Sequence, residues 1–398
     1  MPINLTLIIK KIGLCVVLLY FVSTYLSYIN PAYVNFVSYS LYILAVIGLI
    51  HILVSFNKIE INKYIKLYSL FSIIVFYFAV FPYLGSSYAN VVLDSFYEII
   101  RTLVLLYCCS LFIRDINDIK KVLFAISISS TIMIFFTAKN FDIDSGIRFG
   151  NEIAGNANII APLFMFSAFS TIYFLCNTSS KVTKLVMLFF YIIQLYALIL
   201  TGTKKTFLIS FFFLWIYYII SRKNNYLLMM VFLFLGIELF IYIVLNIPFV
   251  YNLIGYRFES MLSFFTGSGI SDASTLERAS MVEDAINIGM SNPVFGIGLN
   301  MFSIIANYST YSHNNYVELF CTTGILSALF YYSIYIYAII SLFKQQVDNE
   351  EKSFFVLVIF SLLIYELGAV TYNLPFVQIF VMLTYIYIQH SKKKYKFA

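Results

Sequence analysis

The stretch KKIGLCVVLLYFVSTYLSY, residues 10–28, places two lysines before an apolar run that is long enough to cross a bilayer. The run is too long for the core of a secretory signal peptide, and no small-x-small cleavage site follows it. We therefore expect a first membrane span that the protein keeps. The whole chain has the same character: 61% of its 398 residues are hydrophobic, 11% are charged, and its mean hydropathy is +0.89. This composition predicts an all-α integral membrane protein.

Apolar runs long enough for a bilayer of about 30 Å begin near residues 12, 33, 66, 91, 121, 158, 185, 205, 226, 315, 353 and 374. These runs predict twelve spans, all helical, because a lone strand leaves its backbone unsatisfied in lipid. With the N-terminus in the cytoplasm, 18 of the 25 Lys and Arg residues fall on the inner side. This asymmetry predicts a multi-pass protein of the cytoplasmic membrane with both termini in the cytoplasm. The net charge of +6 then follows from topology and indicates no nucleic-acid partner.

We interpret residues 1–398 as a single polytopic membrane domain. Within it, residues 247–314 form a large loop on the outer side that is long enough to fold as a small helical cap over the bundle. No internal repeat is visible, and the position of this loop argues against the paired halves of many transporters. The five cysteines have neither a disulfide framework nor metal-ligand spacing.

The segment STLERASMVEDAINIG, residues 274–289, begins with the capping-box pattern of Ser274 and Glu277, which predicts a helix. At about 100° per residue, its polar and apolar side chains separate into two arcs. Arg278 falls near the centre of the apolar arc, although the helix offers a polar arc as well. A solvated or snorkelling side chain is therefore a weaker explanation for Arg278 than for the other cations.

Other cations also fall on the side that the positive-inside rule leaves poor in charge. The positions at this boundary are Arg148, Lys204, Lys205, Arg257 and Arg278. Several cations together suit a strongly anionic ligand such as a lipid diphosphate, which arginine can bind with two parallel hydrogen bonds. For Lys139 and Lys205 we favour the simpler interpretation of a solvated or snorkelling side chain.

Charged residues also occur inside predicted spans. Glu98 and Arg101 lie three residues apart and share one helical face, which favours an ion pair, with ligand binding by Arg101 as the alternative. Glu238 and Glu366 are also intramembrane, and the sequence names no partner for them.

His313 is the one histidine of the chain on the predicted outer side. It stands beside Asn314 at the start of a predicted span and faces the same compartment as the cations. A lone histidine is often only a hydrogen-bonded structural residue, but in this position it could orient or deprotonate a hydroxyl nucleophile. The sequence has no phosphate-binding glycine loop, His/Cys metal cluster, Gly-x-Ser-x-Gly elbow or Asp-x-Asp motif. We therefore expect no cofactor and no metal, and a donor that is already activated.

Four stretches, in this order and spacing, resemble the O-antigen polymerase and O-antigen ligase superfamily of bacterial membrane glycosyltransferases. They are RFGNEIAGNANIIA (148–161), LTGTKKTFLIS (200–210), STLERASMVEDAINIGMSNPVFGIGLNMF (274–302) and SHNNYVELFCTTGILSALF (312–330). The resemblance covers roughly residues 146–330, together with the large outer loop between the ninth and tenth spans.

The resemblance implies a metal-independent transferase with a GT-C-type bundle that uses polyprenyl-diphosphate-linked glycans at the outer face of the membrane. The family pattern of an arginine, ten residues and a glycine falls on Arg278 and Gly289. By this resemblance Arg278 and His313 are the candidate catalytic residues. The candidate substrate-binding residues are Arg101, Arg148, Lys204, Arg257 and Asn314.

Two further family patterns match with one departure each, and the departure in the second, where Ser327 replaces a glycine usual in the family, we interpret as a change in packing. The small residue, serine and arginine pattern falls on Thr203 and Lys204, so a lysine replaces the arginine and keeps the charge without the planar fork. The histidine, asparagine and later glycine of the family fall on His313, Asn314 and Gly324.

Three functions remain open at this point. The first is a polymerase that joins polyprenyl-diphosphate-linked repeat units into O-antigen or capsular polysaccharide, with lipid-linked glycans as donor and acceptor. An O-antigen ligase or related oligosaccharide transferase would share the donor and differ in the acceptor. A polysaccharide transporter or flippase would share the many spans, but repeat symmetry is expected of it. The expected partners are the lipid-linked glycan, membrane lipids and a chain-length regulator protein.

Overall fold

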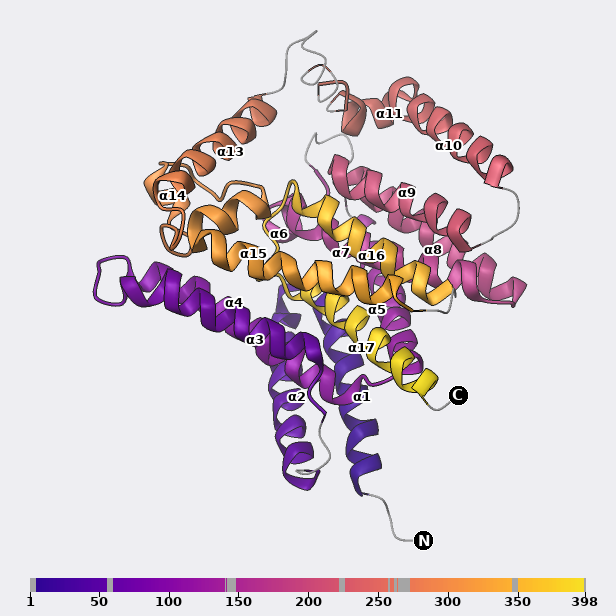
Figure 1. Cartoon of the computed structure of the whole chain (residues 1–398). Coiled ribbons are helices and arrows are strands. Elements are labelled where there is room, and N and C mark those ends of the chain that lie inside the picture. The colour runs from indigo at the N-terminus through magenta and orange to yellow at the C-terminus, as the bar shows by residue number, and fades with distance from the viewer. Residues whose placement is uncertain are drawn as a thin grey trace.

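Helices make up all the regular secondary structure in the part of the chain that the computed structural model describes (Figure 1). The described residues are 5–55, 60–139, 141, 148–221, 226–256, 258–260, 263, 273–345 and 350–396. The first half contains α1 (Leu5–Leu26), η1 (Pro31–Tyr33), α2 (Val34–Val54), α3 (Lys63–Val75), η2 (Phe76–Val80), η3 (Phe81–Tyr83), α4 (Ala89–Phe112), α5 (Ile116–Ala138), α6 (Asn151–Ala154), α7 (Ala157–Asn177) and α8 (Lys181–Leu200). The second half contains α9 (Lys204–Ser221), α10 (Tyr226–Asn246), α11 (Pro248–Val250), η5 (Tyr251–Gly255), α13 (Ala273–Ser291), α14 (Phe302–Ile305), α15 (Asn315–Phe343), α16 (Glu350–Glu366) and α17 (Pro375–Lys396).

Eight of the described helical segments are long and apolar enough to cross a bilayer. They are α1, α2, α3 with its continuation to Tyr83, α5, α7, α8, α9 and α15. The prediction of an all-α integral membrane protein is therefore confirmed. The other four predicted spans are also helical, as α4, α10, α16 and α17, and the count of twelve stays a prediction.

α7 is the central helix among these candidate spans. The apolar window of α7 is 78% buried, compared with 22% for the peripheral α2. α7 packs against α5, α8 and α9, and Asn156 caps its first turn by accepting the amide of Asn158. The first residues of α7, the most enclosed of these helices, lie beside the candidate site described below.

α15 is bent by a break at Gly324, which has φ +78° in the middle of the helix. A Cβ atom at this position would lie 2.0 Å from the carbonyl oxygen of Val294, so only glycine fits. The break frees two carbonyl groups of α15 for the loop that follows α13. Ile297 donates its amide to Cys321 O (2.9 Å), and Gly298 donates its amide to Thr322 O (3.0 Å). The kink thus anchors this loop directly on α15.

α13 packs on α15 through a narrow stripe of small and apolar residues. Met281 and Ala285 are buried in the described structure. A Cβ atom at Gly289 would lie 2.6 Å from the Phe320 ring and 3.3 Å from the Cα of Cys321, so glycine lets the two helices approach closely. This gives a physical reason for the glycine of the Arg-x10-Gly pattern. The helix begins at Ala273, one residue before the predicted cap.

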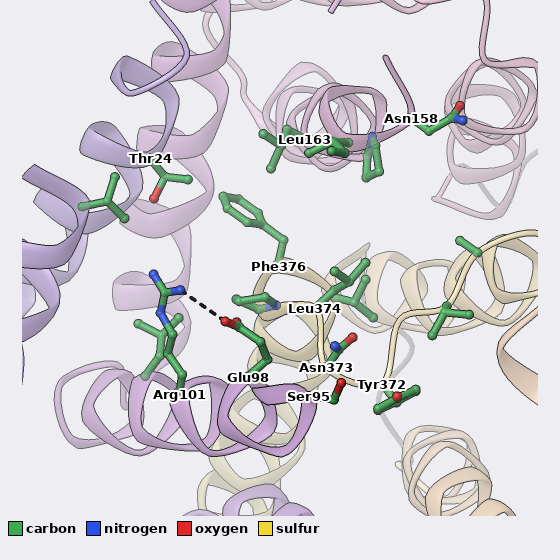
Figure 2. Close-up of a pocket in the computed structure, with 18 of the residues that line it drawn as sticks. Thr24, Ser95, Glu98, Arg101, Asn158, Leu163, Tyr372, Asn373, Leu374 and Phe376 are labelled. Atoms are coloured by element: carbon green, nitrogen blue, oxygen red, sulfur yellow. Dashed lines mark ion pairs between the residues drawn. The ribbon is translucent and has the colours of Figure 1, made fainter. Parts of the chain in front are cut away.

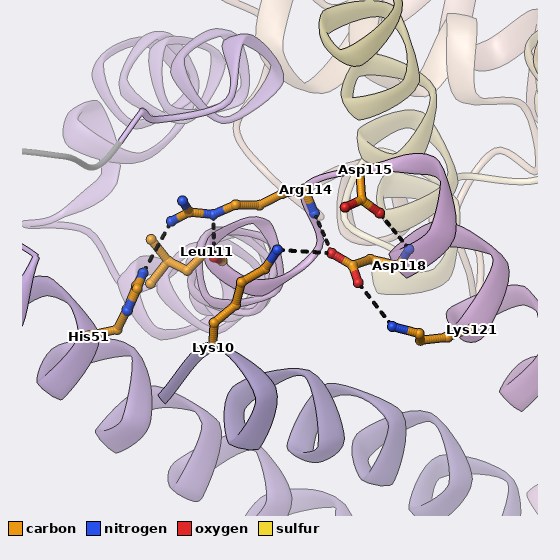
Figure 3. Close-up of polar contacts among 7 residues, drawn as sticks. All are labelled: Lys10, His51, Leu111, Arg114, Asp115, Asp118 and Lys121. Carbon is orange, nitrogen blue, oxygen red and sulfur yellow. Dashed lines mark hydrogen bonds and ion pairs between the residues drawn. The ribbon is translucent and has the colours of Figure 1, made fainter. Parts of the chain in front are cut away.

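A polar cluster joins three helices and the α4–α5 turn near the starts of α1 and α5 (Figure 3). The carboxylate of Asp118 is buried and lies 3.4 Å from Lys10 Nζ and 3.3 Å from Lys121 Nζ. It also accepts the backbone amide of Arg114, whose guanidinium contacts His51 Nε2 at 3.1 Å. The residues joined come from α1, α2, the α4–α5 turn and α5. We name this group the Asp118 cluster.

Candidate functional site

A cavity of about 770 Å³ lies where six separate segments of the chain meet. Its walls come from the residues before α7, the α8–α9 turn, Tyr256 after η5, the start of α13, the turn before α15 and the end of α16. Its described lining holds four Lys or Arg residues and no Asp or Glu. The Lys, Arg and His residues of the described lining are Arg148, Lys204, Lys205, Arg278 and His313. We name it the cationic cavity. Four of the seven predicted site residues converge there.

Arg278 enters the cationic cavity from the buried side of α13. It stands three and seven residues before Met281 and Ala285, so it extends their stripe beyond the contact with α15. Arg278 itself is exposed to the cavity. By helical periodicity Ala279 and Ile286 belong to the predicted apolar arc, but both are exposed, so that arc was too broad. Within the described residues no carboxylate pairs with Arg278, so its guanidinium is available to an anion.

His313 has an unusual backbone conformation immediately before the N-cap of α15. Its φ of +58° is in the left-handed region, which is uncommon for a residue with a side chain. The turn is held on both sides: the amide of Ser312 donates to Glu318 Oε2 (2.9 Å), and Asn314 Oδ1 caps the helix by accepting the amide of Tyr316 (3.0 Å). Strain that the surroundings maintain in this way is typical of functional positions.

The electrostatic surroundings keep His313 neutral. Burial lowers the pKa of His313, the positive charges of Arg278 and Lys205 lower it in the same direction, and together they bring it to about 4. At neutral pH the imidazole therefore has a nitrogen that can accept a proton or a hydrogen bond. Its ring lies against that of Tyr311, with 4.7 Å between the centroids.

Arg148 and the α8–α9 turn form the opposite wall. Arg148 Nε donates to Thr201 O (2.6 Å), and its Nη2 donates to Thr203 Oγ1 (3.0 Å) and Asn158 Oδ1 (3.2 Å). These contacts fix the turn that carries Lys204 into the cavity. The structure therefore gives Arg148 a positioning role in addition to its predicted contact with the ligand.

Lys205 is the site residue that sequence reasoning missed. Its ammonium group donates to Gly368 O and lies 4.5 Å from the centroid of the Tyr365 ring. It lines the cationic cavity and is close enough to His313 to lower its pKa. The sequence does contain one signal for Lys205. The TGTKKT turn has two adjacent lysines, although the family pattern requires only one cation there.

The other predicted site residues lie elsewhere. Arg101 lines a neighbouring cavity, where it is 3.7 Å from Glu98 as the i,i+3 pattern predicts. Asn314 caps α15 and does not line the described cationic cavity. Arg257 lies outside the described residues.

The neighbouring cavity has a volume of about 940 Å³ and combines polar and apolar walls (Figure 2). Figure 2 shows Ser95, Glu98 and Arg101 on one helix, across from Leu374 and Phe376. The two cavities share four lining residues, namely Asn158, Tyr311, Tyr365 and Ala369. The two cavities therefore adjoin each other. We name this one the mixed cavity.

The structure shows the hydrogen-bond partners of Glu366, which could not be identified from the sequence. Its carboxylate accepts Thr371 Oγ1 (2.6 Å), Tyr335 OH (2.8 Å) and Asn315 Nδ2 (3.1 Å). Asn315 in turn accepts the backbone amide of Thr371 (2.8 Å). This buried network ties the end of α16 to the first residue of α15, two positions after His313, so it helps to fix the histidine.

Among the described residues, no group of three or more His, Cys, Asp or Glu side chains is arranged to hold a metal ion. The charged groups around the cationic cavity are Lys and Arg, which match phosphate oxygens rather than a cation.

Comparison with protein families gives one match. Residues 189–332 match the family model described as O-antigen ligase. The matched region includes the α8–α9 turn, α13, the His313 turn and the bent part of α15. The comparison with curated proteins finds no match. The predicted resemblance to the O-antigen polymerase and ligase superfamily is confirmed over this region.

Proposed function

We propose that this membrane protein, which matches the family model described as O-antigen ligase over residues 189–332, polymerises polyprenyl-diphosphate-linked oligosaccharide repeat units into O-antigen or capsular polysaccharide. The observation that carries the proposal is the convergence of Arg148, Lys204, Lys205 and Arg278 beside a neutral His313 in one cavity. Anion-binding groups and a proton acceptor are the two chemical elements that glycosyl transfer from a lipid diphosphate requires.

In the proposed reaction, the diphosphate of the donor lies in the cationic cavity. The acceptor hydroxyl oxygen attacks the anomeric carbon, the bond from that carbon to the diphosphate oxygen breaks, and His313 takes the hydroxyl proton. Arg278, Lys204 and Lys205 offset the negative charge that develops on the leaving lipid diphosphate. The free energy of the donor bond drives the reaction, so the chain needs no nucleotide.

Binding of the donor would also change the pKa of His313, the proposed base. Arg278 and Lys205 lower the pKa of His313 in the empty cavity. A diphosphate among them adds negative charge close to the imidazole, which raises that pKa towards its ordinary value. His313 would therefore become a stronger proton acceptor only when the donor is present.

By the same proposal the site faces the outer side of the cytoplasmic membrane, and both termini are cytoplasmic. The lipid-linked glycan serves as donor and acceptor, and a chain-length regulator protein is the proposed protein partner.

The test is electrophoresis of surface glycan from a deletion strain that is complemented with wild-type protein or with His313→Ala. We expect the wild type to restore long chains and the variant to leave single repeat units on the surface anchor, at equal amounts of protein in the membrane. Long-chain ladders from His313→Ala would contradict the proposal.

An O-antigen ligase is the second candidate, because the matched family model has that description. It would use the same donor and the same cationic cavity, with a different acceptor. In the deletion strain a ligase would leave all glycan unanchored, with finished polymer accumulating on its lipid carrier. The same gel therefore separates the two functions.

A further inference from the structure

The mixed cavity has one polar and one apolar region. The apolar wall includes Leu41, Leu163 and Phe376, while the carboxylates of the described lining are Asp94, Glu98 and the buried Glu318. Amide side chains complete the polar region, at Asn158, Asn300 and Asn373. Carboxylates and amides are the groups that bind sugar hydroxyls, since they can accept hydrogen bonds, and the amides can also donate them.

The position of the mixed cavity suits an attacking nucleophile. In a displacement reaction the nucleophile approaches the anomeric carbon from the side away from the leaving group. The cationic cavity would hold the leaving diphosphate, and the mixed cavity adjoins it across Tyr311, whose ring contacts His313. A hydroxyl that enters from the mixed cavity would therefore pass Tyr311 and approach His313, which lines the cationic cavity itself.

The charge of the mixed cavity is opposite to that of its neighbour. Asp94 and Glu98 lie four residues apart on α4 and thus on one face of the helix. Arg101 is the one Lys or Arg in the described lining, and it lies 3.7 Å from Glu98. Asp94 has no such partner within the described residues. A ligand with its own carboxylate or phosphate would meet like charge here, whereas hydroxyl or ammonium groups would meet acceptors.

Resting on the proposed function, we infer that the mixed cavity is the acceptor site and that it selects a neutral or amine-bearing terminal sugar over a carboxylated one. The donor sugar is a less suitable occupant, because its anomeric carbon is bound to the diphosphate on the other side of Tyr311.

The first experiment fills the cavity without altering the cationic site. Ser95→Trp places a large ring in the lining on α4, and Leu93→Trp is the matched control, because Leu93 is on the same helix, is 39% exposed and lines neither cavity. The acceptor probe is the free oligosaccharide that mild acid releases from the lipid-linked unit of a deletion strain. The donor probe is a polyprenyl diphosphate, whose binding is measured by titration of the purified protein.

We expect Ser95→Trp to lower kcat/KM for the free oligosaccharide at least tenfold and to bind the polyprenyl diphosphate as wild type does. Leu93→Trp should match wild type in both measurements. Unchanged use of the acceptor by Ser95→Trp would overturn the inference, and so would loss of diphosphate binding, which would assign the cavity to the donor. A wild-type protein that neither binds the diphosphate nor transfers glycan would instead refute the proposed function.

The second experiment tests the selection by charge. The probe is the same oligosaccharide with its terminal primary alcohol oxidised to a carboxylate. We expect wild type to prefer the unoxidised acceptor at least tenfold, and the double variant Asp94→Asn/Glu98→Gln to narrow that preference. Equal use of both probes by wild type, or a natural acceptor that ends in a uronic acid, would overturn the selection by charge.

Discussion

The cationic cavity and the Asp118 cluster contain the same kinds of positive side chain in opposite electrostatic settings. In the cluster, Lys10 and Lys121 both lie within 3.4 Å of one buried carboxylate. In the cavity, Lys205 and Arg278 have no carboxylate partner within the described residues, and both act on the pKa of His313. The cluster satisfies its charges within the fold, whereas the cavity leaves positive charge for a ligand.

This difference separates residues that maintain the fold from residues to which we assign the proposed function. Charges brought together without a counter-charge destabilise the empty protein, and an anion that binds the folded state reverses that effect. Substitutions in the cluster should therefore alter stability, and substitutions in the cavity should alter activity.

The largest effect is expected for Arg278→Ala, measured as the rate of glycan transfer by purified protein. Removing one preorganised group that stabilises developing negative charge lowers the rate by about 10²–10³-fold. The thermal stability of the empty protein should stay the same or rise, because a repulsive charge is lost. Lys10→Ala, on the Asp118 cluster, is the control and should retain the wild-type rate. Equal losses in the two variants would remove the distinction between the regions.

Gly324→Ala should have the largest effect on folding. Its φ of +78° and the 2.0 Å approach to Val294 O leave no room for a methyl group, so we expect a loss of about 2–4 kcal/mol in the free energy of unfolding. The control is Gly85→Ala, because a Cβ atom there meets nothing within 4 Å. Denaturation in detergent measures both, and a stable Gly324→Ala protein would refute the proposed anchoring of the loop on α15.

A smaller loss of stability is expected for Asp118→Ala. The change removes the acceptor for Lys10, Lys121 and the Arg114 amide, and we expect about 1–3 kcal/mol of destabilisation. The transfer rate per folded molecule should not change, and denaturation combined with an activity assay measures both quantities. A loss of rate without a loss of stability would show that the cluster belongs to the functional machinery.

The most specific effect is expected in the dependence of kcat/KM on pH. Because the pKa of His313 is about 4 in the empty protein, kcat/KM should fall only as the pH approaches that value from above. Lys205→Gln removes one of the two charges that lower this pKa, so the acid limb of kcat/KM should move to higher pH. Lys204→Gln is the matched control and should move it less. An acid limb that is the same in all three proteins would exclude His313 as the titrating group.

Helix positions were predictable from the sequence, because apolar runs of about 20 residues have few alternatives in lipid. The convergence of Arg278 and His313 was also predictable, since Arg278 interrupts an apolar arc and His313 begins a span. Lys205 could not be assigned in this way, because its partners Tyr365 and Gly368 come from the distant end of α16. A hydropathy profile describes one local segment at a time, so it contains no information on contacts between distant segments.

Glu366 and Gly324 illustrate the same limit. The partners of Glu366 come from α15 and from the residues before α17. The need for glycine at 324 arises from the backbone of Val294, thirty residues earlier. Local patterns therefore predict which residues carry charge and where helices occur, while the tertiary structure decides which of those charges are neutralised.

The central claim is that the cationic cavity binds a lipid diphosphate, and the most direct test is titration of purified wild-type and Arg278→Ala protein with a polyprenyl diphosphate. A hydrogen bond to a charged group contributes about 1.5–3 kcal/mol, so Arg278→Ala should weaken binding by about ten- to a hundredfold. Lys10→Ala should bind as wild type does. Equal affinity of Arg278→Ala and wild type, or no binding to wild type, would contradict the account.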